Sequence, residues 1–548
     1  MTAIQLVLAD NQTKQQHRIL VCTPSHTAAD VVCRRLGKFL DRKHLFRLYD
    51  ADRPIATVPV AVLAFCRQSD KSGTFTLPTA TELLSFQVIV CVCSDSHLLY
   101  RAGLTNRQLA CRRQCFKSSI EQAYLNRHLS VSVQGVDKPH FTHLFIDEAA
   151  QATEPETLIP FSVVVDSSPG ARKVEIALVG DPRQLQPAVY SNTAAAAGLD
   201  RSLMERLLQR PVRCLGGGNE TMLGPALVNM EDWLQYSFER DGQEQLSVFL
   251  TTSYRGHASF LMMPSALFYA DKLLSADIHK NDNVGGDGIG LLNWCEILRG
   301  VENLSELACI RIVDATGTST ALPVELEYRR QLSWPMHFRG VIGKDASITI
   351  ESFAGGHSWS NQKEAEAVVE IVVSLVVDQG LESKLIGVMA PFRGQVVLIR
   401  KLLRIKNLGA IDVGTIEDYQ AVERNVIVLS LTRSTPAFIA SDTERRMGVF
   451  GQPKRSNVAL TRAEHMLIVV GNPEVMVKDL VWNQILWFCL RNGLWFGEVG
   501  AVESAFHWGP SNRLVRHMPG VGSKDVLSEE ELAHPIVTIS TMERVFRE

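Results

Sequence analysis

Seven short and almost continuously apolar runs, each separated from the next by a helical stretch, constrain the fold of this chain more than any other feature. Runs of this kind are typical of parallel strands that are buried on both faces of a sheet. Alternation of strands and helices predicts an α/β architecture. The runs are HRILVC from His17, FQVIVCVC from Phe86, HLFI from His143, VEIALV from Val174, LIGVMA from Leu385, NVIVLSL from Asn425 and MLIVVG from Met466.

The seven runs fall into two groups along the chain, so we predict two α/β domains. The first covers residues 1–248 and the second covers residues 249–490, with an insertion near 275–360 that is poor in strand patterns. We predict that residues 491–548 form a loosely structured C-terminal tail, because Gly and Pro residues interrupt any regular pattern there. The length of 548 residues agrees with about three domains at roughly 100–200 residues each.

Composition argues against a membrane protein and a cysteine-based metal site, and it leaves nucleic-acid binding open. The net charge of -3 shows no global basic field, although a local basic groove is compatible with it. The 11 cysteines include no CxxC pair, which favours reduced, buried thiols in an intracellular protein over a structural metal site. The longest apolar helical run, AVVEIVVSLVV, contains Glu370 and is too short to span a bilayer. We predict no membrane segment and no targeting segment.

The sharpest local signal is LFIDEAAQATEPE at residues 144–156, where an apolar strand ends in Asp147 and Glu148. In P-loop enzymes an acid at such a strand end holds the magnesium ion that bridges the phosphates. A neighbouring carboxylate can orient and deprotonate the attacking water. We therefore predict Asp147 as the Mg²⁺ ligand and Glu148 as a catalytic residue; the alternative is a capped loop.

Two further patterns have weaker individual signals. The segment LVGDPRQLQPAV places Gln184 in a polar loop after a strand, where its amide is suited to sense a γ-phosphate; the alternative is a polar turn around Pro182. The segment NVALTRAEHMLIVVGNP places Arg462 before a buried strand. An arginine that reaches a transferred phosphate from another domain acts as an arginine finger, whereas most arginines are surface residues.

Taken in order along the chain, the motifs resemble those of superfamily-1 helicases of the nonsense-decay type. This family has two RecA-like parallel-sheet P-loop NTPase domains, which bind ATP with Mg²⁺. The resemblance rests on RILVCTPSHTAAD, DEAA, GDPRQLQP, TTSYRGHASFLMMPSALFYADKL (251–273), IGVMAPFRGQ (386–395), VGTIEDYQAVERNVIVLSLTRS (413–434) and KRSNVALTRA (454–463).

Two segments are similar to the Armitage-type RNA-silencing branch of these helicases: WPMHFRGVIGKD at 334–345 and GVFGQPKRSNVA at 448–459. That branch handles RNA in small-RNA silencing and retroelement control. The resemblance implies an ATP-dependent helicase that moves on single-stranded RNA in the cytoplasm and its ribonucleoprotein granules, with Argonaute-type silencing proteins as partners. A non-catalytic RNA-binding scaffold and a DNA helicase of the related branch are the alternatives.

The family's site residues carry over onto matching positions of this sequence. By this resemblance Arg255 contacts the γ-phosphate, Tyr254 stacks near the adenine and Glu423 binds the ribose. The residues implied to hold RNA phosphates are Thr23, Pro24, Ser25, Gly414 and Thr415.

The chain also departs from the family pattern at three positions. Ala421 and Val422 stand where the family has Gly and Gln, and His26 stands where Asn is usual. Ala421 adds a Cβ where glycine lets the backbone adopt any conformation. These changes put the coupling between nucleotide and RNA in question.

No G-x-x-x-x-G-K-[ST] phosphate-binding loop is present in the sequence. In the family that loop leads into a helix ahead of the strand that begins here near His17, and Ile4, Val7 and Leu8 have the spacing of such a helix. The absence predicts a fragment or a truncated gene model that begins at an internal methionine, inactive by itself. A degenerate helicase without ATPase activity is the alternative.

Overall fold

The computed structural model describes fifteen segments of the chain, which include most of the two predicted domains. They are 1–9, 17–68, 74–112, 139–168, 173–208, 248–255, 258–269, 271–276, 312–313, 319–320, 336–349, 357–491, 494–501, 506–508 and 514–516. The glycines at 216–218, most of the predicted insertion and most of the predicted tail lie outside them.

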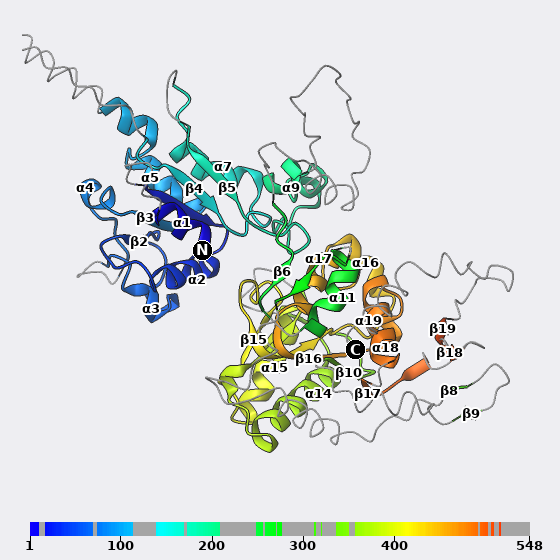
Figure 1. The fold of residues 1–548 in the computed structure, drawn as a ribbon. Helices are drawn as coiled ribbons and strands as arrows, with labels where there is room; N and C mark the ends of the chain where they lie inside the picture. The colour runs from blue at the N-terminus through cyan, green and yellow to red at the C-terminus, as the bar shows by residue number, and fades with distance from the viewer. Residues whose placement is uncertain are drawn as a thin grey trace, which may run out of the picture. The chain divides into compact units, whose positions relative to one another are not determined.

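The chain divides into two compact units, Met1–Pro225 and Ala226–Glu548 (Figure 1). This division falls within 209–247, outside the described residues, so the predicted domain boundary at 248/249 stays a prediction.

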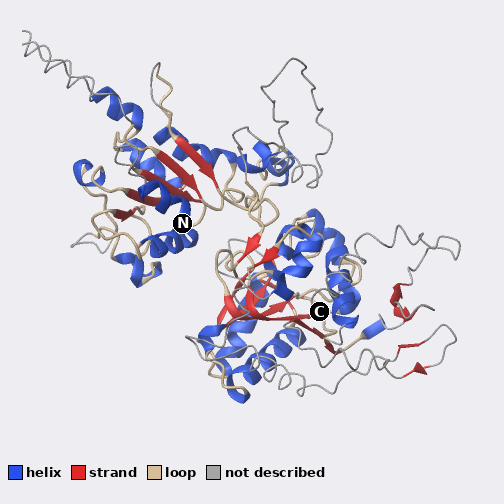
Figure 2. Ribbon diagram, in the orientation of Figure 1, coloured by secondary structure: helices blue, strands red, loops and turns tan. Residues whose placement is uncertain are grey.

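The first unit is built on a five-stranded parallel sheet, with the strand order β2-β3-β1-β4-β5 (Figure 2). Four of its strands confirm predicted runs, whereas the three-residue β2 was too short to show as an apolar run. The strands are β1 (Ile19–Thr23), β2 (Leu45–Arg47), β3 (Val88–Val92), β4 (His143–Ile146) and β5 (Glu175–Leu178).

Alternate residues of β1 point into two separate cores, as expected of a strand that is covered on both faces. Leu20 and Cys22 pack into one buried cluster, and Ile19 and Val21 pack into the other. The predicted N-terminal helix is present as α1 (Thr2–Ala9), whose Ile4 is buried in the second cluster. The sheet is thus a layer between two cores, which is the α/β arrangement that the sequence predicts.

Polar capping residues set where the helices of the first unit begin. Ser25 caps α2 (His26–Leu36) by accepting a hydrogen bond from the Ala28 N–H. Thr153 and Glu156 form a capping box at the start of α7 (Glu154–Val164). The other described helices are α3 (Val60–Leu63), α4 (Ala80–Leu83), α5 (His97–Arg101), α8 (Asn192–Ala196) and α9 (Leu203–Leu208).

The second unit contains a six-stranded parallel sheet, with the order β14-β13-β15-β16-β10-β17. Its strands β13 (Ile386–Ala390), β15 (Arg424–Ser430) and β16 (Ala463–Gly471) confirm the second group of predicted runs. The strands β10 (Met336–Gly340), β14 (Asp412–Thr415) and β17 (Trp495–Gly497) were not predicted as such.

Two of these strands lie outside the predicted body of the second domain. β10 lies inside the predicted insertion and β17 inside the predicted tail, yet both pair with the main sheet. His337 and Arg339 interrupt the apolar pattern of β10, which explains why the run was not recognised. Arg339 forms an ion pair with Glu370 at 2.6 Å, so this cation is matched at the surface of the sheet.

Helices cover the second sheet and complete its core. α14 (Gln362–Val373) and α15 (Arg393–Ile405) pack together, and their buried side chains join those of β13 and β15 in one cluster. The other described helices are α11 (Ala258–Phe268), α16 (Phe438–Glu444), α17 (Pro453–Leu460), α18 (Pro473–Met476) and α19 (Leu480–Arg491). No described helix is long and apolar enough to cross a membrane.

Four two-stranded sheets complete the described strands. They pair β6 (Thr252–Ser253) with β7 (Leu274–Ser275), β8 (Ile312–Val313) with β9 (Ser319–Thr320), β11 (Ala346–Thr349) with β12 (His357–Ser360), and β18 (Phe506–Trp508) with β19 (Leu514–Arg516).

A buried carboxyl group lies in the core of the second unit, at the end of β15. Glu364 accepts hydrogen bonds from the Ser430 hydroxyl at 2.7 Å and from the Thr432 N–H at 2.6 Å. Burial raises the pKa of Glu364 to about 8, in spite of these two donors. The folded unit therefore retains a proton that the unfolded chain releases near pH 4.5.

This proton makes the stability of the second unit depend on pH. Between about pH 4.5 and pH 8 the folded state binds more protons at Glu364 than the unfolded state, so the free energy of unfolding falls as pH rises. We predict that Glu364→Gln removes this decrease. All eight tryptophans lie after Ala226, so urea unfolding followed by tryptophan fluorescence at pH 5, 6.5 and 8 reports on this unit alone.

The matched control is Glu366→Gln, a change to an exposed carboxylate on the same helix. It should leave the pH dependence of the wild-type chain unchanged. Parallel pH profiles for the wild type and Glu364→Gln would show that the buried carboxyl is ionised throughout, and the assignment would be wrong.

Candidate functional site

The acid pair of the first unit lies where two strand ends meet. The Asp147 N–H donates to the Cys22 carbonyl at 2.9 Å, which extends the β1–β4 ladder by one bond past the end of β4. The Glu148 N–H donates to the Asp147 carboxylate at 3.1 Å. Glu148 has a φ of 55°, in the left-handed region that non-glycine residues seldom adopt. The turn thus places the two acidic residues next to each other, and the Glu148 N–H holds the Asp147 carboxylate.

The loop after β5 packs directly against this turn. The Ala149 N–H donates to the Val179 carbonyl at 2.8 Å. A Cβ at Gly180 would lie 2.9 Å from the backbone nitrogen of Ala149, so only glycine fits at this close approach. Gln184 lies in the same loop, where its amide nitrogen donates to the Asp181 carboxylate at 3.0 Å. The structure therefore brings together two motifs that the intervening helix α7 separates in the sequence.

The electrostatics of Asp147 favour a cationic ligand. Burial raises the pKa of Asp147, and the opposing groups are the Glu148 N–H, the N-terminal amino group and the Arg35 guanidinium. A bound cation would stabilise the carboxylate that burial disfavours.

The donor set also suits magnesium better than a metal with an all-protein ligand shell. In the described residues no group of three or more His, Cys, Asp or Glu side chains could hold a metal ion. Mg²⁺ usually takes one or two carboxylates and completes its shell with water and substrate phosphates. A single half-buried carboxylate such as Asp147 fits that pattern.

The predicted RNA-contact loop of the first unit follows β1, the neighbour of β4. Thr23 is buried, and its hydroxyl donates to the Ser25 carbonyl at 2.7 Å. The Ser25 side chain is committed to capping α2, as described above. The backbone of this loop is thus fixed by its own side chains before any ligand binds.

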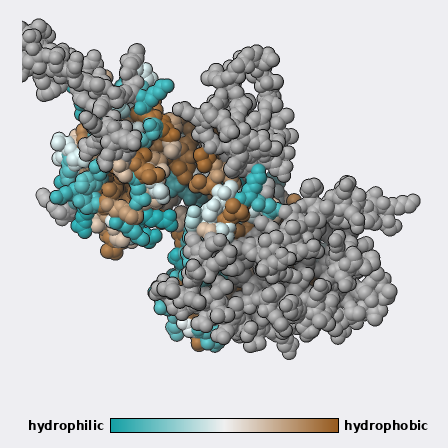
Figure 3. Space-filling view, in the orientation of Figure 1, coloured by the Kyte–Doolittle hydropathy of each residue, from teal (hydrophilic) through white to brown (hydrophobic). Residues whose placement is uncertain are grey.

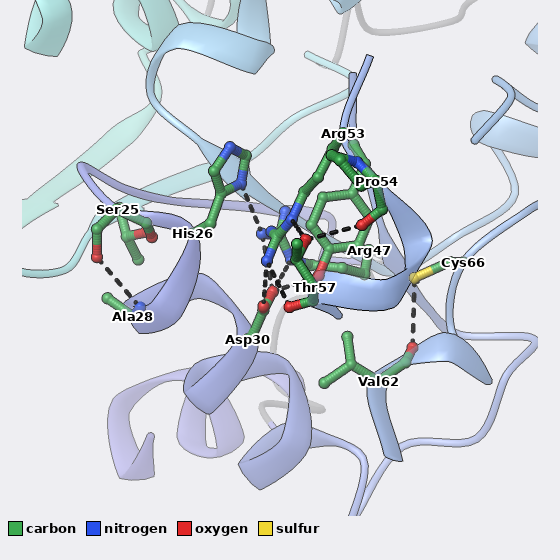
Figure 4. A network of polar contacts seen from close by, with 12 residues as sticks. Ser25, His26, Ala28, Asp30, Arg47, Arg53, Pro54, Thr57, Val62 and Cys66 are labelled. Atoms are coloured by element: carbon green, nitrogen blue, oxygen red, sulfur yellow. Dashed lines mark hydrogen bonds and ion pairs between the residues drawn. The ribbon is translucent and has the colours of Figure 1, made fainter. Parts of the chain in front are cut away.

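A network of charges supports the same loop from the next elements (Figure 4). The buried Asp30 of α2 accepts from Arg47 at 3.0 Å, from Arg53 at 3.1 Å and from the Tyr49 hydroxyl. Both guanidinium groups also lie over the Tyr49 ring, at 3.9 and 4.6 Å from its centroid. Two cations share one carboxylate here, which leaves an excess positive charge under α2.

That excess charge acts on His26, the residue that departs from the family pattern. Burial lowers the pKa of His26 to about 4, and the nearby Arg53 and Arg47 contribute to the decrease. Its Nδ1 lies 3.5 Å from the Arg47 guanidinium. The imidazole is therefore neutral at physiological pH, and a contact from it to RNA would be a neutral hydrogen bond.

In the second unit three of the predicted site residues lie side by side at the start of β15 and β16. The Arg255 guanidinium forms an ion pair with the Glu423 carboxylate at 2.6 Å. It also donates to the Thr461 carbonyl at 3.2 Å. The Arg424 N–H donates to the Arg462 carbonyl at 3.3 Å, which ties the two segments together. These contacts join three motifs that are far apart in the sequence.

Arg462 itself is nearly inaccessible, with 1% of its surface exposed. Its guanidinium donates to the Thr461 hydroxyl at 2.9 Å, and that hydroxyl donates to the Asn457 carbonyl at 2.9 Å. An arginine that is buried and oriented in this way is not the surface residue of the alternative interpretation. Tyr254, by contrast, is 72% exposed beside Arg255.

The second predicted RNA-contact segment, Gly414–Thr415, ends β14 in a closed turn. The Thr415 N–H donates to the Asp418 carboxylate at 2.9 Å, and the Asp418 N–H donates to the Thr415 hydroxyl at 3.3 Å. The Arg400 side chain of α15 donates to the Val413 carbonyl at 3.0 Å. A phosphate that binds the Thr415 N–H must therefore displace the carboxylate of Asp418.

The departure at Ala421 has a visible backbone consequence. Ala421 has a φ of 57°, in the region that glycine adopts without steric cost and other residues do not. The sequence predicted only that a Cβ is added at this position. The structure adds that this Cβ is held in a strained conformation two residues before Glu423.

Sequence reasoning missed the residues that support the site. Asp418, Arg400 and the pair Asp30–Arg47 hold the predicted contact loops in place. Asp30 and Asp418 lie inside two of the quoted motifs, but the motif argument gave neither of them a role. A charged residue inside an otherwise apolar segment was the available signal, because such residues are seldom buried without a partner. Asp30 and Arg47 are both buried.

Two family models, each described as an AAA domain, match residues 125–192 and 232–474. The human RNA helicase Mov10l1 is 30% identical over 504 residues, which are 91% of this chain and 33% of that protein. The probable RNA helicase armi of Drosophila melanogaster is 28% identical and has 36% of its length covered. The putative helicase MOV-10 of Gallus gallus is 28% identical and has 42% of its length covered.

Two parallel RecA-like sheets with an acid pair after β4 and a buried arginine before β16 define the class of helicase-type nucleoside-triphosphatases. Within that class the chain belongs to the superfamily-1 helicases, in the branch of Mov10l1 and armi. It spans about a third of the length of these curated relatives.

The electrostatics of Asp147 generate one prediction. Asp147→Asn removes a carboxylate whose charged form is destabilised by burial, and the amide Oδ1 can still accept from the Glu148 N–H. The free energy of unfolding should therefore rise by about 1 kcal/mol. Asp181→Asn is the matched control: it removes a carboxylate that accepts from Arg183 N–H and Gln184, and stability should fall. Thermal unfolding followed by circular dichroism measures both. A decrease for Asp147→Asn would contradict the assignment.

The strained backbone at Ala421 generates another prediction. Ala421→Gly relieves a left-handed alanine, and the free energy of unfolding should rise by roughly 0.5–1 kcal/mol, because the steric gain exceeds the entropy that glycine adds to the unfolded chain. Ala437→Gly, at a φ of -62°, should lower it by a similar amount. Urea unfolding followed by tryptophan fluorescence reports on both. The same sign for the two variants would show that Ala421 is unstrained.

Proposed function

We propose that this chain is most of the motor core of an ATP-dependent RNA helicase, which couples nucleoside-triphosphate hydrolysis to movement along single-stranded RNA. The observation that carries the proposal is the cluster of Arg255, Glu423 and Arg462 in the second unit. A buried guanidinium and a charge pair beside it are suited to stabilise developing charge on a phosphate.

The first unit would supply the groups that act on the phosphates and on water. Asp147 would hold Mg²⁺, which when bound neutralises charge on the β- and γ-phosphate oxygens. Glu148 would orient and deprotonate the attacking water, because its backbone is held in the turn next to Asp147. Gln184 would contact the γ-phosphate or the water, after its amide leaves Asp181.

The second unit would supply the positive charge and the base contacts. Arg255 and Arg462 would stabilise the transferred phosphate, and Glu423 would bind the ribose. Since Arg255 pairs with Glu423 here, nucleotide binding would have to separate these two side chains. The exposed ring of Tyr254 is available to stack on the adenine.

Single-stranded RNA would be gripped through its phosphates by Thr23–Ser25 and Gly414–Thr415. Backbone contacts of this kind tolerate any sequence and weaken with salt. The relatives Mov10l1 and armi are named RNA helicases, which favours RNA over DNA as the ligand of this chain. A role in RNA silencing, Argonaute-type partners and a cytoplasmic location belong to this proposal through the family alone.

The absence of a G-x-x-x-x-G-K-[ST] motif limits what the 548 residues can do by themselves. That loop supplies the backbone N–H groups and the lysine that hold the β- and γ-phosphates. The retained Asp147, Glu148, Arg255 and Arg462 would then act only when such a loop is supplied.

This proposal predicts that the 548-residue chain hydrolyses ATP negligibly, and that a longer version with the phosphate-binding loop ahead of Met1 hydrolyses ATP in response to single-stranded RNA. In the longer version Arg462→Ala should lower the RNA-stimulated rate on the order of a thousandfold, because a finger arginine contributes at least this much, with RNA affinity retained. Phosphate release measured with malachite green and RNA affinity measured by fluorescence anisotropy test both parts.

Arg455→Ala is the control, on the helix α17 that precedes Arg462. Arg455 pairs with Glu417 at 2.9 Å and donates to the Arg446 and Gly448 carbonyls, so its removal should reduce stability more than turnover. Equal reduction of RNA binding and hydrolysis in Arg462→Ala would overturn the finger assignment. Nucleotide-independent RNA binding without hydrolysis in the longer chain would favour a scaffold, and tighter binding of matched DNA would favour a DNA helicase.

A further inference from the structure

A dense group of cations lies on the first unit, outside the predicted site residues. It consists of Arg34, Arg35, Lys38, Arg42 and Lys43, and all five side chains are exposed. The segment 34–43 contains one acid, Asp41, so its net charge is +4 in a chain whose total is -3. We call these five cations, together with Phe39, the α2 basic patch.

Among the described residues, the cations of the α2 basic patch have no partner. Within the residues that the structure describes, none of the five side chains forms an ion pair or a hydrogen bond. Asp41 is already engaged, since its carboxylate accepts from the Lys43 N–H at 3.0 Å and lies 2.6 Å from the His44 ring nitrogen. The field of the patch is therefore not cancelled locally.

Helix stability accounts for only part of this charge. Arg34 and Arg35 lie in the last turn of α2, where cations stabilise the negative end of the helix dipole. Lys38, Arg42 and Lys43 follow the helix and gain nothing from that effect. They lie in two tight turns, in which the Phe39 N–H donates to Leu36 and the His44 N–H donates to Asp41, so the five charges stay close together.

An exposed aromatic ring lies among these charges. Phe39 has 65% of its surface exposed, while its neighbours Leu36 and Leu40 pack into the core. The core thus does not need Phe39, and the ring lies in water. Figure 3 shows hydrophilic surface over the part of the first unit that holds α2. A flat ring among unpaired cations is the combination that binds stacked bases and phosphates in single-stranded nucleic acid.

The turn that carries most of the α2 basic patch lies at the opposite edge of the sheet from the predicted RNA-contact loop. The Val88 N–H at the start of β3 donates to His44, so the turn 37–44 lies at the amino ends of the strands. Thr23 ends β1, at the carboxyl edge. The helix α2 spans the sheet between these two edges. The turn and its charges therefore form a separate surface.

We propose that the α2 basic patch is a second binding surface for single-stranded RNA, with Arg42 and Lys43 on the phosphates and Phe39 stacked on a base. This inference rests on the proposed function only for the identity of the ligand, which is single-stranded RNA. Its binding needs no nucleotide, because Phe39, Arg42 and Lys43 do not belong to the candidate nucleotide site.

The test measures the affinity of the 548-residue chain for a labelled oligouridine by fluorescence anisotropy, without nucleotide, at several salt concentrations. Arg42→Glu/Lys43→Glu should weaken binding on the order of tenfold at low salt and reduce the slope of log affinity against log salt by about 1.4, or about 0.7 for each phosphate that is no longer bound. Phe39→Ala should weaken binding about tenfold with the slope unchanged. Lys401→Glu/Lys406→Glu, which makes the same charge change on exposed positions of the second unit, should weaken binding by less than about twofold.

The outcomes separate this proposal from the proposed function. If the wild-type chain binds no RNA, both fail; if it binds RNA and the patch variants bind equally well, only the patch is wrong. Polyglutamate could displace the labelled oligouridine as effectively as unlabelled RNA does, while Phe39→Ala leaves the affinity unchanged. That result would assign the surface to an acidic protein segment instead. Photocrosslinking of a 4-thiouridine oligonucleotide to the wild-type chain avoids any folding defect of the variants. Crosslinks at Phe39 support the patch, and crosslinks confined to other segments overturn it.

Discussion

Parallel strand pairing is the constraint on which the rest of this structure depends. Because every strand of each main sheet runs in the same direction, the loops that follow the strands must gather at one edge. In the first unit this places the ends of β1, β4 and β5 next to one another, and backbone hydrogen bonds from Asp147 to Cys22 and from Ala149 to Val179 fix them. The candidate site of the first unit depends on these hydrogen bonds, because they set the positions of the loops that carry Asp147, Glu148 and Gln184.

The second unit uses both edges of its sheet. The cluster of Arg255, Glu423 and Arg462 lies at the amino ends of β15 and β16, whereas Gly414–Thr415 ends β14 at the carboxyl edge. The segment 416–423 connects the two edges, and it contains the strained Ala421. Strained backbone of this kind clusters at ligand-binding sites and switch regions, and Ala421 lies next to the candidate ribose-binding residue.

The sequence was sufficient for the parts of the fold that depend on local patterns. Seven apolar runs predicted seven strands, because a strand buried on both faces needs apolar side chains at every position. β10 was not predicted because His337 and Arg339 interrupt its apolar run. β2 was not predicted because it has only three residues. The pairing of Arg255 with Glu423 and of Asp30 with Arg47 could not be predicted, since nothing in the local sequence fixes which distant charges meet.

The same long-range pairing decides which charges of the chain are available to a ligand. The guanidinium of Arg433 is neutralised by Asp442 at 2.6 Å and that of Arg255 by Glu423, whereas Arg47 and Arg53 share the carboxylate of Asp30. The cations of the α2 basic patch have no such partner among the described residues. A polyanion responds to the local field and not to the sum over the chain, because exposed charges more than about 10 Å apart are largely screened at physiological salt. A total of -3 is therefore compatible with strong binding of RNA, and the placement of unpaired cations determines where that binding occurs.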